Sequence, residues 1–170
     1  MRSPDTTLEK KPASILFVCL GIICRSPTAH GVFEHQLKKA DLHTSIRIDS
    51  AGTGAYHVGE LPDSRMRASA RQHGISLEHI RARAVHESDF EEFDLILAMD
   101  ESNFSDLMAI CPEHLQHKIR LFLDFSRHAE LQSVPDPYFG DQDGFDHVMR
   151  LITETCENLI AYIRMLNDKI

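Results

Sequence analysis

Residues 15–27, ILFVCLGIICRSP, join an apolar run to a cysteine and, six positions later, an arginine. The β-branched, apolar residues before Cys19 predict a buried strand. Ser26 is a favoured N-cap and Pro27 suits the first helical position, so a helix is predicted to begin there. The apolar face of that helix consists of Ala29, Phe33, Leu37 and Ala40. The loop between strand and helix therefore lies at the carboxyl end of a strand, where α/β folds bind phosphates.

The loop of residues 19–25 combines an anion site with a nucleophile. Backbone N–H groups at a helix N-terminus and the Arg25 guanidinium can hold a tetrahedral dianion. Free cysteine has a pKa of about 8.5, and these groups, with a hydrogen bond from Ser26, favour the Cys19 thiolate. Gly21 lets the backbone approach phosphate oxygens because it has no Cβ. The combination predicts a cysteine-based phosphatase; the alternative is a buried cysteine that ends a strand.

The remaining cysteines have different predicted roles. Cys24 is either a packing residue or the partner of a reversible disulfide with Cys19 that protects the nucleophile from overoxidation. Cys111 and Cys156 fall in helical stretches and are predicted to be structural. Four cysteines in 170 residues do not form a disulfide scaffold, and in a reducing cytosol they are expected to be thiols.

Composition indicates one soluble enzyme domain. The 170 residues are 42% hydrophobic and 26% charged, and the net charge of −8 disfavours nucleic-acid binding. No apolar stretch approaches the ~18 residues that a membrane span requires. Residues 1–13 lack the apolar segment of a signal peptide and are expected to form a flexible extension. Residues 14–170 then form the domain, and a cytoplasmic location is expected.

Strand and helix patterns alternate along the chain. Strands are predicted at residues 45–51, 81–85, 93–99 and 118–123, in addition to the first. Helices are predicted from Asp63 to His73, with Gly74 as the C-cap signal, and from Asp100 to about Ile110. A long closing helix has a continuous apolar stripe at Phe145, Met149, Ile152, Cys156, Leu159, Ile163 and Leu166. The order predicts an α/β fold with a parallel sheet covered on both faces.

A phosphatase also needs an acid over the leaving group, and residues 134–140, VPDPYFG, provide a candidate. Two prolines stiffen the backbone around Asp136, which can protonate the leaving oxide and then deprotonate water. Tyr138 and Phe139 can wall a slot for an aromatic substrate. Taken alone, the segment is more typical of a plain proline-bordered turn, and that alternative stays open.

From about Ser14 to Leu166 the chain closely resembles the low-molecular-weight protein tyrosine phosphatases. The resemblance lies in the cysteine loop, Asp-Pro-Tyr at 136–138, Ser-Ala-Gly-Thr at 50–53, His-Gly-Ile at 73–75 and Met-Asp-Glu-Ser-Asn at 99–103. In other cysteine phosphatases the acid precedes the nucleophile, so the order here makes the match specific. The family implies a four-stranded parallel sheet in a single domain, a phosphocysteine intermediate, and neither metal nor other cofactor.

The resemblance also implies residue roles. Cys19 is the nucleophile, Arg25 the phosphate clamp, Ser26 the partner of the thiolate and Asp136 the general acid and base. Tyr56, with Tyr138 and Phe139, is expected at the substrate cleft. Supporting positions around the site are expected at Ser50, His73 and Asp100, although a purely structural role is equally compatible with His73 and Asp100. The loop that surrounds the phosphate consists of Leu20, Gly21, Ile22, Ile23 and Cys24.

Two functions compete with hydrolysis of phosphotyrosine. Arsenate reductases resemble this family and use the same loop, but they need further cysteines near the middle of the chain, and residues 28–110 contain none. A non-catalytic phosphotyrosine-binding module is the second alternative, because Ile22 departs from the family pattern.

A zinc site is not predicted at Cys111, His114 and His117. These residues lack the second ligand pair that a zinc site needs, so a solvated helix face is favoured there.

The expected partners follow from this assignment. The substrate is a phosphotyrosine-containing protein or a small aryl phosphate, since family members that act on phosphoarginine tend to carry threonine at the position of Ile23. Inorganic phosphate and other oxyanions are expected as product or inhibitors. Neither nucleic acid nor membrane is expected as a partner, and the protein is expected to be a monomer or a weak homodimer.

Ile22 provides a first test. The family usually has asparagine there, whose amide ties the loop to the serine matching Ser50 and tolerates a left-handed backbone. Isoleucine has no amide, and positive φ is costly for a β-branched residue. The empty loop is therefore predicted to be shifted or mobile, with Ser50 losing a partner, and Ile22→Asn is expected to change turnover or phosphate affinity. Steady-state kinetics and phosphate inhibition of the variant measure both, and two unchanged values would contradict the idea.

Overall fold

The apolar run before the cysteine forms β1 (Ser14–Cys19), and all six of its residues are buried. In the computed structural model, which describes residues 8, 11–20, 25–54, 58–127, 133–135 and 142–166, β1 is a central strand. It pairs in parallel with β2 (Arg47–Gly52) on one side and β3 (Leu95–Ala98) on the other. β4 (Ile119–Leu121) continues the sheet, so the order is β2-β1-β3-β4. The predicted four-stranded parallel sheet is confirmed.

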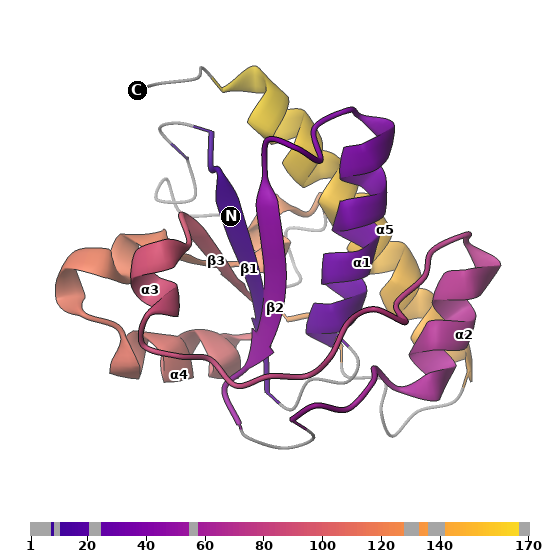
Figure 1. The fold of residues 1–170 in the computed structure, drawn as a ribbon, viewed down its shortest axis with the longest axis horizontal. Helices are drawn as coiled ribbons and strands as arrows, with labels where there is room; N and C mark the ends of the chain where they lie inside the picture. The colour runs from indigo at the N-terminus through magenta and orange to yellow at the C-terminus, as the bar shows by residue number, and fades with distance from the viewer. Residues whose placement is uncertain are drawn as a thin grey trace.

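Successive residues of β1 enter two different cores, as the two-residue period of a strand requires. Ile15 and Phe17 join the core beneath α1 (Arg25–Lys39), α2 (Ser64–Gln72) and α5 (Gln142–Met165). Leu16 and Val18 join the core on the opposite face, beneath α3 (Asp89–Glu92) and α4 (Glu101–Ile110). Figure 1 shows α1, α2 and α5 on one side of the sheet and α3 and α4 on the other. Burial on both faces explains why β1 is apolar throughout.

Two short 3-10 helices, η2 (Glu113–Lys118) and η3 (Phe122–Phe125), flank β4. The stripe predicted for the closing helix is confirmed by the burial of six of its residues: Phe145, Met149, Ile152, Cys156, Leu159 and Ile163. α2 also matches its prediction. The Asp63 side chain caps the helix by accepting a hydrogen bond from Arg65 N, and Gly74, with φ +76°, follows the C-cap residue His73.

Two local predictions were wrong. α1 begins at Arg25, two residues before the predicted first helical position at Pro27, so Ser26 lies within the first turn of the helix and not at its N-cap. The strand predicted at residues 81–85 is a single bridge between Ala84 and Gly52. It stays that short because the backbone of Ala82 is hydrogen-bonded to the segment before α2: Gly59 N donates to Ala82 O, and Ala82 N donates to Glu60 O.

Part of the predicted N-terminal extension contacts the domain. Leu8 N donates to the Tyr162 hydroxyl at 3.0 Å, and Leu8 packs against the core of α1 and α5. Ala13 N donates to Asp94 Oδ2 at 2.8 Å. In the part of the chain that is described, none of the helices has the length and apolarity to cross a membrane.

The packing of α1 against the segment after α2 gives a test of the fold. A Cβ built on Gly31 would overlap Leu77 Cδ2, and Leu77 is fully buried. Alanine normally stabilises a helix relative to glycine, but overpacking costs about 1–3 kcal/mol, so Gly31→Ala should lower the free energy of unfolding. Urea denaturation measures the loss. Adding Leu77→Ala to Gly31→Ala should cost less than the sum of the two single changes, because the second substitution relieves the overlap; full additivity would contradict this account.

Candidate active site

The chain switches direction across the sheet at β1, because β2 lies on one side of it and β3 on the other. In open parallel sheets such a switch point opens a crevice at the carboxyl ends of the strands. Cys19 is the last residue of β1, Arg25 begins α1, and Asp100 follows β3 as the N-cap of α4. Cys19 and Arg25, close in sequence, thus lie at the same end of the sheet as Asp100, which is 75 residues from Arg25.

Cys19 contacts a hydroxyl group directly. Its Sγ lies 3.1 Å from Ser26 Oγ, and both side chains are buried, with 2% and 0% of their surface exposed. Ser26 Oγ is also 3.5 Å from the Ala51 carbonyl oxygen, at the far limit for a hydrogen bond between oxygens. The hydroxyl is therefore better placed to donate to sulfur than to the carbonyl. This placement follows from the start of α1 at Arg25, which turns Ser26 back toward β1.

Arg25 is anchored at two points. Its Nη1 donates to Asp100 Oδ2 at 2.7 Å and to the Val134 carbonyl at 3.0 Å. The arginine side chain is 7% exposed and that of Asp100 20% exposed, so water screens the pair weakly. Val134 N in turn donates to Met99 O at 2.7 Å, which holds this segment against the end of β3.

Asp100 makes a second contact with its other oxygen. Oδ1 accepts from Asn103 N at 2.7 Å, the capping bond of α4. One carboxylate therefore starts a helix and orients the guanidinium.

The beginning of the loop after Cys19 is bonded to the end of β2. Thr53 N donates to Cys19 O at 2.9 Å and Gly54 N to Leu20 O at 3.0 Å. Leu20, the residue after Cys19, is 49% exposed.

Several residues predicted for the site lie outside the described part of the chain. They include most of the loop, the predicted acid and the aromatic residues of the cleft, and their roles stay predictions. These residues are Gly21, Ile22, Ile23, Cys24, Tyr56, Asp136, Tyr138 and Phe139.

Ser50 has a partner that the sequence analysis did not identify. Its Oγ lies 3.0 Å from Nδ1 of His30, and the two residues are 5% and 9% exposed. Ser50 therefore has a hydrogen-bond partner on α1, whereas the predicted loss of a contact with residue 22 lies outside the described residues and stays a prediction. Burial lowers the pKa of His30, against the opposing effects of Glu34 and Asp49, so the neutral ring is favoured. Spacing in the sequence could have pointed to His30, because it follows Ser26 by four residues and therefore lies on the same face of the helix.

His73 lies away from these contacts. It is the exposed C-cap of α2, and its Nδ1 lies 2.9 Å from the carbonyl oxygen of Ser69. No contact recorded for it within the described residues reaches Cys19, Arg25 or Ser50. The structure therefore brings Ser50 and Asp100 to the site region but places His73 at a helix end.

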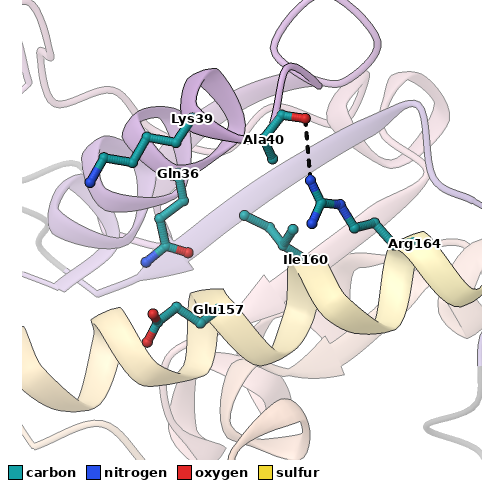
Figure 2. Close-up of a pocket in the computed structure, with 6 residues that line it drawn as sticks. All are labelled: Gln36, Lys39, Ala40, Glu157, Ile160 and Arg164. Atoms are coloured by element: carbon teal, nitrogen blue, oxygen red, sulfur yellow. Dashed lines mark hydrogen bonds between the residues drawn. The ribbon is translucent and has the colours of Figure 1, made fainter.

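A hollow of about 280 Å³ lies elsewhere, between α1 and α5. Figure 2 shows Gln36, Lys39 and Ala40 facing Glu157, Ile160 and Arg164 across it, with Arg164 Nη2 donating to Ala40 O. Its lining contains no nucleophile, so it is not the candidate active site. Among the residues with described positions, no group of three His, Cys, Asp or Glu is arranged to hold a metal ion.

Comparison with known proteins identifies the family. The model of the family described as low molecular weight phosphotyrosine protein phosphatase matches residues 14–169. The yeast (Saccharomyces cerevisiae) protein of that name is 40% identical over 150 residues, 86% of this chain and 92% of its own. The human protein of that name is 38% identical over 149 residues, 87% of this chain and 94% of its own.

A solved structure agrees with this assignment. A protein tyrosine phosphatase from Entamoeba histolytica, with Hepes in its active site, superposes with a TM-score of 0.85 at 41% identity. The match covers 89% of this chain and 96% of that one. On sequence and fold together, this chain belongs to the low molecular weight phosphotyrosine protein phosphatase family and is a protein tyrosine phosphatase, a phosphoric monoester hydrolase.

Proposed function

We propose that the protein hydrolyses phosphotyrosine through a phosphocysteine intermediate, with Cys19 as nucleophile, Arg25 as phosphate clamp and Asp136 as general acid and base. One observation carries the proposal. A buried cysteine contacts a serine hydroxyl at 3.1 Å, six residues before an arginine that an aspartate holds at 2.7 Å. A thiolate with a hydrogen-bond donor beside an oriented guanidinium is the pairing that attack on a phosphate monoester requires.

In the first step, the electron pair of the Cys19 thiolate forms a bond to phosphorus while the bond from phosphorus to the aryl oxygen breaks. Asp136 gives its proton to the departing oxygen, which leaves as a phenol. The planar guanidinium of Arg25 matches two of the phosphate oxygens and stabilises the charge they carry. Ser26 donates to the cysteine sulfur and so favours the thiolate before attack.

In the second step, Asp136 accepts a proton from water, and the resulting hydroxide oxygen bonds to phosphorus. The bond from sulfur to phosphorus breaks and its electron pair returns to Cys19 as thiolate. Inorganic phosphate leaves, and the acid is again protonated for the next turnover. The cycle consumes one water for each ester and needs neither metal nor redox partner.

The proposal extends to partners and setting. The substrate is a phosphotyrosine-containing protein or a small aryl phosphate, with Tyr56, Tyr138 and Phe139 around its ring, and phosphate or other oxyanions bind the same loop. Residues 14–170 carry the activity in the cytoplasm as a monomer or weak homodimer, without nucleic acid or membrane. The support is the family, the net charge of −8 and the site geometry described above.

The direct test is hydrolysis of p-nitrophenyl phosphate. Cys19→Ser should abolish turnover, EDTA should leave it unchanged, and Asp136→Asn should lower kcat by about 10²–10⁴-fold, the usual contribution of general acid catalysis. Turnover that survives Cys19→Ser would overturn the mechanism. Comparing phosphotyrosine, phosphoserine, phosphoarginine and arsenate separates the alternatives: thiol-dependent arsenate reduction would indicate a reductase, and binding without hydrolysis a phosphotyrosine-binding module.

The ion pair beneath the clamp gives a second test. Asp100→Asn keeps an oxygen for the capping bond from Asn103 but removes the charge that orients Arg25. Hydrogen bonds to charged groups contribute about 1.5–3 kcal/mol, so kcat/KM and phosphate affinity should fall by about 10- to 100-fold. Thermal stability should also fall, because the cap remains but the guanidinium stays buried without its counter-charge. Asp63→Asn, a matched substitution at the N-cap of α2, should leave kinetics unchanged, and equal losses in both variants would contradict the role.

A further inference from the structure

We propose that His30 is a positioning residue for the Cys19 thiolate: by bonding Ser50, it holds β2 against α1 and keeps the Ser26 hydroxyl directed at the sulfur. The inference rests on the proposed role of Cys19 as nucleophile. It assigns to His30 an effect on the reaction without contact with the substrate.

The location of His30 places it directly behind the nucleophile. It lies one helical turn after Ser26 on α1, and its ring points to β2, where Nδ1 meets Ser50 Oγ at 3.0 Å. Both groups are buried, so the hydrogen bond forms without competition from bulk water. Losing one partner would leave the other buried and unsatisfied, which makes the contact a strong constraint on the spacing of α1 and β2.

The spacing of α1 and β2 affects Ser26 through Ala51, the residue of β2 that follows Ser50. In the sheet register Ser50 pairs with Phe17, Ala51 with Val18 and Gly52 with Cys19, so β2 runs alongside the nucleophile. The hydroxyl of Ser26 has one proton and two acceptors, Cys19 Sγ at 3.1 Å and Ala51 O at 3.5 Å. A small shift of Ala51 toward α1 would give the proton to the carbonyl and deprive the thiolate of its donor.

The charges around His30 couple this arrangement to pH. Glu34 on α1, Asp49 on β2 and His79 in the segment after α2 act on the ring, and His79 Nε2 lies 2.7 Å from Glu34 Oε1. Burial outweighs the two carboxylates and lowers the pKa of His30 below 6.5. The neutral ring can accept from Ser50 or donate to it, whereas the protonated ring can only donate. Protonation as the pH falls below the usual histidine range would therefore change the orientation of the Ser50 hydroxyl and weaken the constraint.

The test measures the thiolate itself. The rate of Cys19 alkylation by iodoacetate, followed by mass spectrometry of the peptide that contains it, needs neither substrate nor turnover. His30→Leu and Ser50→Ala should each lower this rate at neutral pH by about three- to tenfold, the effect of losing one hydrogen bond. The double variant should lose no more than either single one, because both remove the same contact.

Conservative and matched variants separate positioning from general damage. The amide of His30→Gln can bond Ser50, so this variant should recover most of the rate at neutral pH while losing the histidine-dependent fall in rate below about pH 6.5. His43→Gln, which changes an exposed histidine before β2, should behave as the wild type at every pH.

The result that would overturn the proposal is an unchanged alkylation rate in His30→Leu and Ser50→Ala together with a lower thermal stability, which would leave His30 a structural role only. If His30→Leu does not fold, the pH profile of alkylation in His30→Gln and the alkylation rate of Ser50→Ala test the proposal instead. Failure of the proposed function appears separately, as a wild-type protein whose Cys19 is alkylated but which hydrolyses no phosphate ester.

Discussion

The ion pair between Arg25 and Asp100 joins the start of α1 to the start of α4 across the end of the sheet, at 2.7 Å. Both groups are largely removed from water, and the cost of desolvating two charges commonly matches or exceeds their attraction. The ion pair itself therefore contributes little net stability to the fold, apart from the capping bond that Asp100 makes to α4. The pair is better explained by orientation: it fixes the plane of a guanidinium at the edge of the sheet, beside the end of β1.

Around this pair, the groups of the candidate site come from several elements. The first turn of α1 supplies Ser26, β2 supplies Ala51 and Ser50, and Val134 lies against the end of β3 through its bond with Met99. Cys19 is thus positioned by the relative placement of these elements. In the proposal made above for His30, its buried contact with Ser50 bears on the chemistry without touching a substrate.

Most of the fold could be predicted because its signals are local. The apolar run of β1 and the stripe of α5 follow from the periods of strand and helix, and Asp63, Gly74 and Asp100 indicate their helix ends directly. The errors arose where a local signal competed with a distant one. Ser26 has the residue type of an N-cap, but its hydroxyl is used by Cys19; residues 81–85 have strand character, but Ala82 is bonded to Gly59 and Glu60.

The sequence by itself determined the α/β class, the position of the cysteine at the end of a strand and the family, because these depend on spacing within short segments and on motifs. Only the tertiary structure decided which side chains meet: Arg25 with Asp100, 75 residues away, and His30 with Ser50, 20 residues away. The physical reason is that helix and strand periods specify the face on which a residue lies, but not its neighbour on the next element. That choice depends on strand order and register, which place β2 and β3 on opposite sides of β1.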